Sequence, residues 1–359
     1  MKTRLGIIGL GNQVRNYYLP YLERRARDFE DAVEIAWISG YLPDDEILGE
    51  PYKARGLLCL SADSWKELLR AGDLDAVLVS LPNALHEEPI RLALSLGISV
   101  GVDKPTTIGA RDCRELVKLA AAKRLVFTTL SQRRYETVYK TVAEMVGSDL
   151  LGKPLLIDYI IAHENFGRGT WVSSRRLAGG GALISSGYHG IDVILWILSH
   201  SADPVAIRSV SARWILDDGD CVSEDDRVET VCAVRIILSD GLFNATASFG
   251  NPAGSLDENI KIFGSHGTFR IMRDRLRKTD QSAASLTYQS IDGLYRVFDT
   301  SGLVGERWAP LADFLDAVLA RKQGLPWSVL SPASDSIRTI EVVEKAYDSA
   351  RCGGREIDL

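Results

Sequence analysis

Short apolar runs alternate with amphipathic stretches over the first 130 residues. The runs are rich in β-branched and aliphatic residues, as strands are, and lie at 5–10, 33–39, 57–60, 76–80, 98–102 and 126–130. Between them, the stretch 83–96 places Leu85, Leu92 and Leu96 at helical spacing. Strands that alternate with helices predict a doubly wound parallel α/β sheet, which binds ligands at the carboxyl ends of its strands.

The pattern changes after a predicted linking helix at 136–146. Longer runs with β character follow, at 155–162, 205–216, 228–238, 243–249, 260–263 and 268–272. Asp240-Gly241 and Ser265-His266-Gly267 lie between neighbouring runs, as hairpin turns do. These features predict a large, mostly antiparallel open sheet in an α+β domain that also carries an apolar helix at 191–198.

Two helices are predicted to close the chain, at 311–322 and 332–350. We expect a dinucleotide-binding domain at 1–130 and a substrate and oligomerisation domain at 131–310. The closing helices at 311–359 are expected to pack back on the body. A length of 359 residues also favours more than one domain.

Composition narrows the class of protein. Apolar residues make up 46% and charged residues 25%, as in ordinary globular proteins. The net charge of −6 and the lack of a basic run argue against nucleic acid, and no apolar run approaches the roughly 20 residues that span a membrane. The five cysteines are scattered without a C-x-x-C pair, so we expect reduced thiols, a cytoplasmic location and no metal site.

A glycine-rich turn follows the first predicted strand and precedes a helix. Gly9 permits the tight turn, and Gly11 lets a pyrophosphate approach the backbone at the helix N-terminus, beside Asn12 and Gln13. The third position of this fingerprint is Val14 rather than glycine or alanine. The context of strand, turn and helix nevertheless predicts dinucleotide binding.

The end of the second strand bears on the choice of cofactor. Ser39 stands where an acid commonly accepts hydrogen bonds from the NAD ribose, so no carboxylate there would repel a 2′-phosphate. Arg15, on the first helix, could reach such a phosphate. We therefore favour NADP(H) over NAD(H), with the alternative that Asp44 or Asp45 loops back to supply the acid.

The fourth strand is followed by polar residues over the expected nucleotide cleft. Ser80, Pro82 and Asn83 are candidate contacts to the cofactor, and Asn83 could equally cap the next helix. His86, a few residues later, is expected to contact the cofactor or cap the helix rather than catalyse.

Asp103-Lys104-Pro105 follows the fifth strand. A lysine at this edge of the sheet could bind the cofactor and donate a hydrogen bond to a substrate oxygen, stabilising a developing alkoxide. A cis Lys-Pro bond would aim the side chain inward. Asp103 is expected to hold the lysine or a cofactor ribose, and a purely structural role for the motif is the alternative.

A second glycine-rich segment, 179–192, leads into the apolar helix. It carries His189, which can transfer protons near neutral pH, and Tyr188, a further candidate proton donor that would also line the substrate site. A structural histidine is the alternative at position 189.

Taken together, five segments resemble the glucose–fructose oxidoreductase / inositol dehydrogenase / MocA (Gfo/Idh/MocA) family. They are the first βα turn at 6–12, a "DAV…PN..H" segment at 75–86, a Glu-Lys-Pro-like motif at 101–105, a "W……GGGAL.D.G.H.ID…W" motif from 171 and a closing segment at 334–359. The resemblance covers essentially the whole chain.

The resemblance implies a Rossmann domain, an open C-terminal sheet that forms homodimers or homotetramers, and hydride transfer between NAD(P) and a sugar, cyclitol or polyol CH–OH. Lys104 and His189 correspond to the catalytic pair, and Ser185 occupies the place of the family's aspartate. Serine adds no charge, so we expect a less basic His189; Asp192 could substitute, but more naturally anchors the helix.

The substrate pocket is expected near Trp171, Arg175 and Arg176, together with Lys104 and His189. Two alternative functions remain: a non-catalytic dinucleotide-binding sensor or regulator, and an NAD-dependent enzyme that cleaves glycosides.

Overall fold

The computed structural model describes ten stretches of the chain and divides it into two compact units. The stretches are 2–28, 33–40, 53, 58–60, 64–164, 169–216, 226–249, 256–275, 282–299 and 306–359. Unit 1 comprises 1–132 and 307–337, and unit 2 comprises 133–306 and 338–359. Asp44, Asp45 and Cys221 lie outside the described residues, so the alternative source of a ribose-binding acid is not observed.

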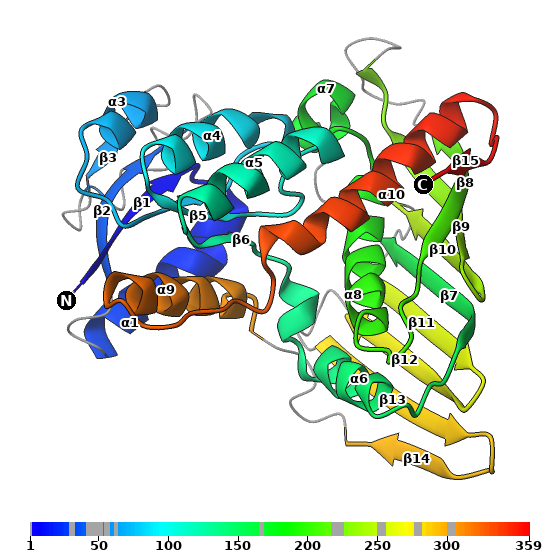
Figure 1. Ribbon diagram of the computed structural model, residues 1–359. Coiled ribbons are helices and arrows are strands. Elements are labelled where there is room, and N and C mark those ends of the chain that lie inside the picture. The colour runs from blue at the N-terminus through cyan, green and yellow to red at the C-terminus, as the bar shows by residue number, and fades with distance from the viewer. Residues whose placement is uncertain are drawn as a thin grey trace. The chain divides into compact units, whose positions relative to one another are not determined.

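Unit 1 is built on a six-stranded parallel sheet with the order β3-β2-β1-β4-β5-β6 (Figure 1). The strands are β1 (Thr3–Ile8), β2 (Val33–Ser39), β3 (Cys59–Leu60), β4 (Ala76–Val79), β5 (Ser99–Val102) and β6 (Phe127–Thr129). β1 lies between β2 and β4, so the strand order reverses there and opens a crevice at the carboxyl ends. The predicted doubly wound sheet is confirmed.

Alternation along the strands of unit 1 sends apolar side chains to two cores. On one face, Leu5 and Leu78 pack with residues of α1 and α9; on the other, Val77 and Val79 pack with α3, α4 and α5. The helices are α1 (Leu19–Asp28), α3 (Trp65–Arg70), α4 (Glu87–Ser95), α5 (Ala110–Ala122) and α9 (Ala309–Lys322). The strands are therefore buried on both faces.

Unit 2 contains a nine-stranded sheet with the order β14-β13-β12-β11-β7-β10-β9-β8-β15. Its strands are β7 (Pro154–His163), β8 (Ile207–Leu216), β9 (Glu229–Leu238), β10 (Leu242–Ser248), β11 (Leu256–Gly264), β12 (Gly267–Arg275), β13 (Ser282–Ser290), β14 (Tyr295–Phe298) and β15 (Ile357–Asp358). β7 and β10 pair in parallel and the other neighbours are antiparallel, which confirms the predicted mostly antiparallel sheet.

The sequence did not predict β13, β14 or β15. Among the residues of β13 whose burial is described, 284–290, the inward-facing ones are Ala284, Leu286 and Tyr288, and small or polar residues separate them, so the apolar alternation is weak. β14 spans four residues and β15 two, too few for a periodic signal.

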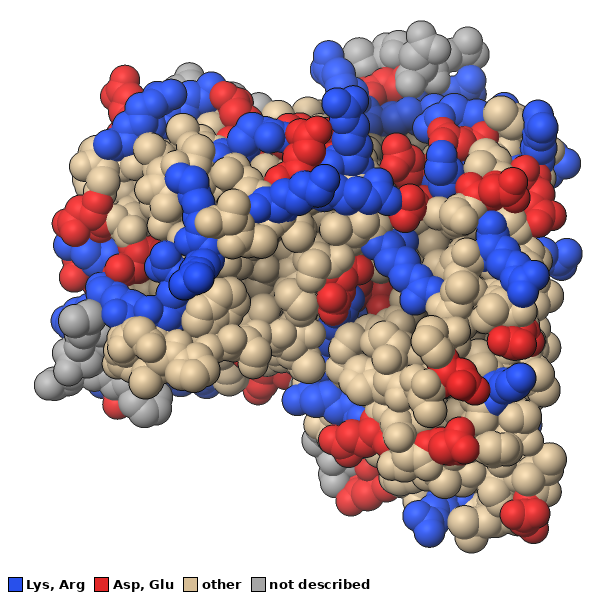
Figure 2. Space-filling model, in the orientation of Figure 1, with Lys and Arg blue, Asp and Glu red and all other residues tan. Residues whose placement is uncertain are grey.

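The helices of unit 2 include α6 (Thr137–Gly147), α7 (Arg175–Ala178) and α8 (Tyr188–Leu198), and α10 (Ala333–Arg351) belongs to unit 1 up to residue 337 and to unit 2 thereafter. Nearly every residue of α8 is buried, as in a helix that lies inside a domain. The stretch Arg175–Leu198 is apolar enough to cross a membrane, with a mean hydropathy of 1.3, but 89% of its most apolar window is buried in the fold. Figure 2 shows cationic and anionic side chains interspersed over the visible surface.

Candidate functional site

The turn after β1 requires glycine at position 9. Gly9 has a φ of 101°, and a Cβ there would lie 2.0 Å from the Ser80 carbonyl oxygen. Its N–H donates to the Ser39 carbonyl at 2.8 Å. The turn is thus held between the ends of β2 and β4, at the strand-order reversal.

Gly11 leaves the backbone open on the far side of this turn. It is exposed, and a Cβ there would meet no atom within 4 Å. Asn12 is also exposed and accepts from the Arg15 guanidinium at 2.8 Å, while Gln13 is half-buried at the start of the helical run. Open backbone at a helix N-terminus suits a pyrophosphate, so these residues fit a dinucleotide.

The residue that bears on the choice of cofactor and the residue at the third fingerprint position are both buried. Ser39 is fully buried at the end of β2. Val14, at the third fingerprint position, is fully buried in the core of unit 1 and begins a π-helical turn, Val14–Tyr18, that precedes α1.

Asp103 is bound from two sides at the end of β5. Tyr18 Oη donates to its Oδ1 at 2.6 Å, and Ser80 Oγ donates to its Oδ2. Burial raises the pKa of Asp103, although the two hydroxyl donors and the charges of His86 and Lys104 oppose the shift. Burial and the neighbouring carboxylate also raise the pKa of Tyr18 well above its usual value.

Asn83 differs from its predicted setting, whereas His86 is the N-cap residue of α4, although its side chain makes no capping hydrogen bond. Asn83 is the first residue of a short 3-10 helix, Asn83–Leu85, and α4 begins later, at Glu87, so the interpretation of Asn83 as the cap of that helix is wrong. Pro82 precedes the short helix. The His86 ring is fully buried, with Nδ1 2.8 Å from the Pro105 carbonyl oxygen and Nε2 2.9 Å from that of Leu81. The ring therefore faces the protein rather than a ligand.

Lys104 lies half-buried between Asp103 and Pro105, and its peptide bond to Pro105 is cis. The loop beyond is tied to β6, because Thr106 Oγ1 lies 2.5 Å from Thr129 Oγ1. The crevice edge of unit 1 thus presents a lysine on a loop with fixed neighbours.

In unit 2, the glycine-rich segment is held by Glu229. Its Oε2 accepts from the Gly181 N–H at 2.8 Å, and its Oε1 accepts from the Leu183 N–H at 2.9 Å and from Tyr347 Oη at 2.8 Å. A Cβ at Gly181 would lie 2.1 Å from the Glu229 carbonyl oxygen, so only glycine allows this approach. Burial raises the pKa of Glu229, and the three donors oppose the shift.

Ser185 and His189 lie in one continuous helical run. Ser185 belongs to a π-helical turn, Leu183–Gly187, and His189 to the first turn of α8; both are half-buried. They are one turn apart, as expected if the helix begins before Ser185. Tyr188, a predicted substrate contact and proton donor, is only 1% exposed.

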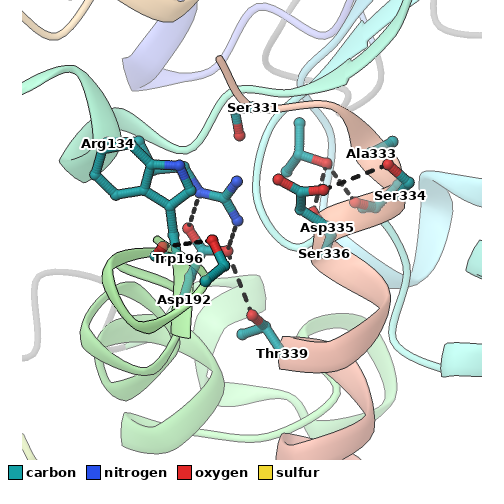
Figure 3. Close-up of polar contacts among 12 residues, drawn as sticks. Arg134, Asp192, Trp196, Ser331, Ala333, Ser334, Asp335, Ser336 and Thr339 are labelled. Atoms are coloured by element: carbon teal, nitrogen blue, oxygen red, sulfur yellow. Dashed lines mark hydrogen bonds and ion pairs between the residues drawn. The ribbon is translucent and has the colours of Figure 1, made fainter. Parts of the chain in front are cut away.

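Asp192 is committed to an ion pair inside unit 2. Arg134 donates to both carboxylate oxygens, from Nε at 3.0 Å and from Nη2 at 2.7 Å, and Thr339 Oγ1 donates at 3.3 Å (Figure 3). Both charged side chains are almost completely buried. Asp192 therefore anchors α8, and both of its oxygens bind Arg134.

A second histidine lies beside the helical run. His163, at the end of β7, contacts Ser186 Oγ through Nε2 and the Glu164 carbonyl oxygen through Nδ1, and its ring lies 5.2 Å from that of Phe249. The contact with Ser186 places it next to Ser185.

The predicted pocket residues follow in α7 and the turn before it. Trp171 is half-buried, and the Arg175 guanidinium lies 5.0 Å from the centre of the Trp214 ring. Arg176 is exposed, and its N–H donates to Asp226 at 2.8 Å. This bond, with that from Ser174, lowers the pKa of Asp226.

Sequence reasoning missed the residues that support the site: Tyr18, Arg134, His163, Glu229 and Tyr347. One signal was present, because Glu229 is a charged residue within an apolar run that predicts a strand. A charge in such a place is buried only when it has hydrogen-bonding partners.

A parallel sheet with an open glycine turn at its strand-order reversal defines a dinucleotide-binding Rossmann unit. Comparison with known families agrees. Residues 3–130 match the model "Oxidoreductase family, NAD-binding Rossmann fold" and residues 139–270 match the "GFO/IDH/MocA C-terminal domain". The chain therefore belongs to the Gfo/Idh/MocA oxidoreductase family, which confirms the resemblance.

Individual relatives agree with this assignment. The chain is 30% identical to a putative UDP-kanosamine synthase oxidoreductase subunit of Amycolatopsis mediterranei, over 75% of this chain and 74% of that protein. It is 30% identical to an inositol 2-dehydrogenase of Serratia proteamaculans, over 42% of each chain. Its fold is similar to that of an aldose–aldose oxidoreductase from Caulobacter crescentus, solved with glycerol, with a TM-score of 0.77, 19% identity and full coverage of both chains.

Proposed function

We propose that this oxidoreductase transfers a hydride between NAD(P) and a CH–OH carbon of a sugar, cyclitol or related polyol, with Lys104 and His189 as its catalytic pair. The observation that carries the proposal is the half-buried Lys104, which follows β5 at the crevice edge of a dinucleotide-binding unit. The names of the relatives, which include a sugar-nucleotide enzyme and an inositol dehydrogenase, support this substrate class.

Lys104 and His189 have different roles at the substrate hydroxyl group in this proposal. In the oxidation direction, His189 accepts the hydroxyl proton while Lys104 donates a hydrogen bond to the same oxygen and stabilises its developing charge. A bound nicotinamide ring supplies the acceptor for the hydride. In reduction, His189 returns the proton.

Ser185 sets the basicity of His189 in this scheme. A serine can orient the ring by a hydrogen bond but cannot stabilise the imidazolium as a carboxylate does. Because Asp192 is bound to Arg134, it does not compensate. His189 is accordingly a weaker base than its counterpart beside an aspartate.

Single replacements test the pair. Lys104→Ala and His189→Ala should each abolish the change in NAD(P)H absorbance while NADH still binds, as measured by its fluorescence. The substrates to screen are inositols, aldoses and UDP-linked hexoses, each in both directions. Full turnover in either variant would refute the assigned role.

We propose the family's cofactor site for Gly9, Gly11, Asn12, Gln13, Ser39, Ser80, Pro82, Asn83, Asp103 and Lys104. The exposed backbone at Gly11 supports it. For Asp103 the contact is expected to be indirect, because Tyr18 and Ser80 already occupy its two oxygens. The Gly11→Val variant should lose NADH binding without losing its fold.

We propose that NADP(H) binds more tightly than NAD(H). A serine at position 39 leaves no carboxylate there to repel a 2′-phosphate, and Arg15 offers a nearby cation. Titration with both reduced cofactors tests this, and Arg15→Gln should weaken NADPH binding more than NADH binding. Tighter NADH binding by the unchanged protein would refute the preference.

We propose that the substrate pocket involves Trp171, Arg175 and Arg176, with Tyr188 supporting it from inside the fold. Arg175 Nη2 is buried without a hydrogen-bond partner among the described residues, which suits an acidic or phosphorylated substrate. Arg175→Lys should raise KM for such a substrate more than it lowers kcat.

We propose a cytoplasmic homodimer or homotetramer that forms through the sheet of unit 2. Ile160 of β7 and Met272 of β12, which pair with Asn259 of β11 from either side, are each 52% exposed. Light scattering of the full chain and of Met272→Lys tests the interface. Among the described residues, the thiols of Cys113, Cys232 and Cys352 form no disulfide, which supports the location, and cell fractionation would check it.

A second candidate, a non-catalytic dinucleotide sensor, is favoured only by Ser185. Cofactor binding without turnover of any substrate in the screen, by the unchanged protein and by Ser185→Asp, would support it.

A further inference from the structure

The two neighbours of Lys104 are held by polar side chains, of which Tyr18 and His86 are buried and Ser80 is half-buried. Before the lysine, the Asp103 carboxylate accepts from Tyr18 and Ser80. After it, the Pro105 carbonyl oxygen lies 2.8 Å from Nδ1 of the fully buried His86 ring. The backbone of the lysine is thus fixed on both sides.

The His86 ring joins two segments of the crevice edge. Its Nε2 lies 2.9 Å from the carbonyl oxygen of Leu81, two residues after the end of β4, while Nδ1 contacts the loop after β5. β4 and β5 are neighbours in the sheet, so the ring closes the gap between the loops that follow them. We call this arrangement of His86, Leu81 and Pro105 the histidine clasp.

Direct contact with a cofactor does not explain this geometry. A ring that is fully buried, with a carbonyl oxygen opposite each nitrogen, has no polar atom left to offer a nucleotide.

We propose that His86 is a positioning residue for Lys104, which acts by donating from Nδ1 to the Pro105 carbonyl. This inference rests on the catalytic role proposed for Lys104. The contact to Leu81 anchors the ring, and the contact to Pro105 carries its effect to the lysine.

The protonation state of the His86 ring decides which of its two contacts is a hydrogen bond. Both neighbours are acceptors, so both contacts are hydrogen bonds only in the imidazolium, whereas the neutral ring donates to one carbonyl. Burial lowers the pKa of His86, while backbone hydrogen bonds with Pro105, Leu81 and Thr106 and the charge of the Asp103 carboxylate oppose the shift. The proposal requires that the proton retained by the neutral ring sits on Nδ1.

Two variants separate the contacts. In His86→Asn, the amide nitrogen takes the place of Nδ1 and keeps the bond to Pro105. In His86→Gln, it takes the place of Nε2 and keeps the bond to Leu81. Each variant keeps one of the two contacts of the ring and removes the other, so a merely structural role does not predict a difference in kcat between variants of equal stability.

The clasp predicts unequal effects on turnover. His86→Asn should keep kcat within about threefold, and His86→Gln should lower it roughly tenfold to a hundredfold, because small displacements of a catalytic group have effects of that size. NADH affinity and Tm should be similar in the two. Thr128→Val, which removes a buried bond to the Ser331 carbonyl in the same unit, is the matched control and should lower Tm but not kcat.

The proposal would be overturned if the two His86 variants had equal values of kcat. It would also be overturned if kcat fell together with Tm across the two His86 variants and Thr128→Val. If a variant does not fold, the unchanged protein decides, by ¹⁵N NMR of the His86 ring at the pH of full turnover. A proton on Nδ1 supports the clasp, and a neutral ring protonated only at Nε2 overturns it.

A substrate-free measurement separates this proposal from the proposed function. The rate at which acetic anhydride modifies Lys104, followed by mass spectrometry, should change in His86→Gln and not in His86→Asn. If it does so but no polyol is turned over, the proposed function fails and the clasp stands. If a polyol is turned over, but neither kcat nor the rate of Lys104 modification differs between His86→Gln and His86→Asn, the clasp fails and the proposed function stands.

Discussion

Replacing Glu229 with glutamine tests how the glycine-rich segment of unit 2 is held. The carboxylate accepts from the N–H groups of Gly181 and Leu183 and from the Tyr347 hydroxyl. Glutamine has the same shape but only one acceptor oxygen. Whichever way the amide is turned, its NH₂ group faces one of the two backbone N–H donors.

The expected loss of stability follows from that conflict. One buried N–H loses its acceptor, which costs about 1–3 kcal/mol, and the remaining bonds lose the charge that strengthened them. Removing a buried charge returns part of this free energy. We expect a net loss of about 2 kcal/mol, which corresponds to a fall in Tm of roughly 4–8 °C for a unit of this size.

Thermal unfolding of the full chain, with hydrogen exchange of peptides from 179–187, would measure the effect. Glu144→Gln, the same change at an exposed position of α6, is the control and should lie within about 0.5 kcal/mol of the unchanged protein. Tyr347→Phe should cost a similar amount, because it removes one of the three donors to the carboxylate and also the oxygen that accepts from the buried Ile184 N–H. If Glu229→Gln is as stable as Glu144→Gln, the carboxylate does not hold the segment.

Three further changes test neighbouring features. Asp192→Asn leaves the Arg134 charge buried without its partner and should cost about 3–5 kcal/mol in urea unfolding, whereas replacing both by apolar residues should cost less. Ser185→Asp should raise the pKa of His189 by about one unit, so the acid limb of kcat/KM for oxidation should move to higher pH. The pKa of Asp226 is lowered in the folded protein, so its stabilising contribution is present above the ordinary aspartate value and lost as the pH falls through the lower folded value. Asp226→Asn should remove that part of the acid sensitivity seen in thermal unfolding.

The sequence predicted the two sheets because their strands carry regular apolar patterns. β4 and β5 consist entirely of buried residues, and both were predicted within one residue. Where the pattern is diluted by small polar residues, as in β13, the prediction failed. Local periodicity reports which residues face a core, so a strand with few large side chains gives little signal.

The supporting residues of the site could not be predicted in the same way, because their partners are remote in the chain. Tyr18 and Asp103 are 85 residues apart, and Glu229 and Tyr347 are 118 apart. A motif records residues that act close together in sequence, whereas these bonds exist only once the sheets have formed. His86 shows the difference: its spacing after β4 suggested a cofactor contact, and only the folded chain reveals its two carbonyl partners.

The difference between a local sequence motif and the partners seen in the folded chain also matters at position 185, where serine stands in place of the family's aspartate. The sequence alone left Asp192 as a possible substitute for the family's aspartate, since both lie within one turn of His189. In the folded chain, the two oxygens of Asp192 bind Arg134, and one also accepts from Thr339. Using it for His189 would leave a buried guanidinium without its partner, a cost of several kcal/mol that exceeds the gain from a shift of one pKa unit, about 1.4 kcal/mol. The proton transfer proposed for His189 would therefore take place beside a serine, and the pH dependence of turnover would measure that difference.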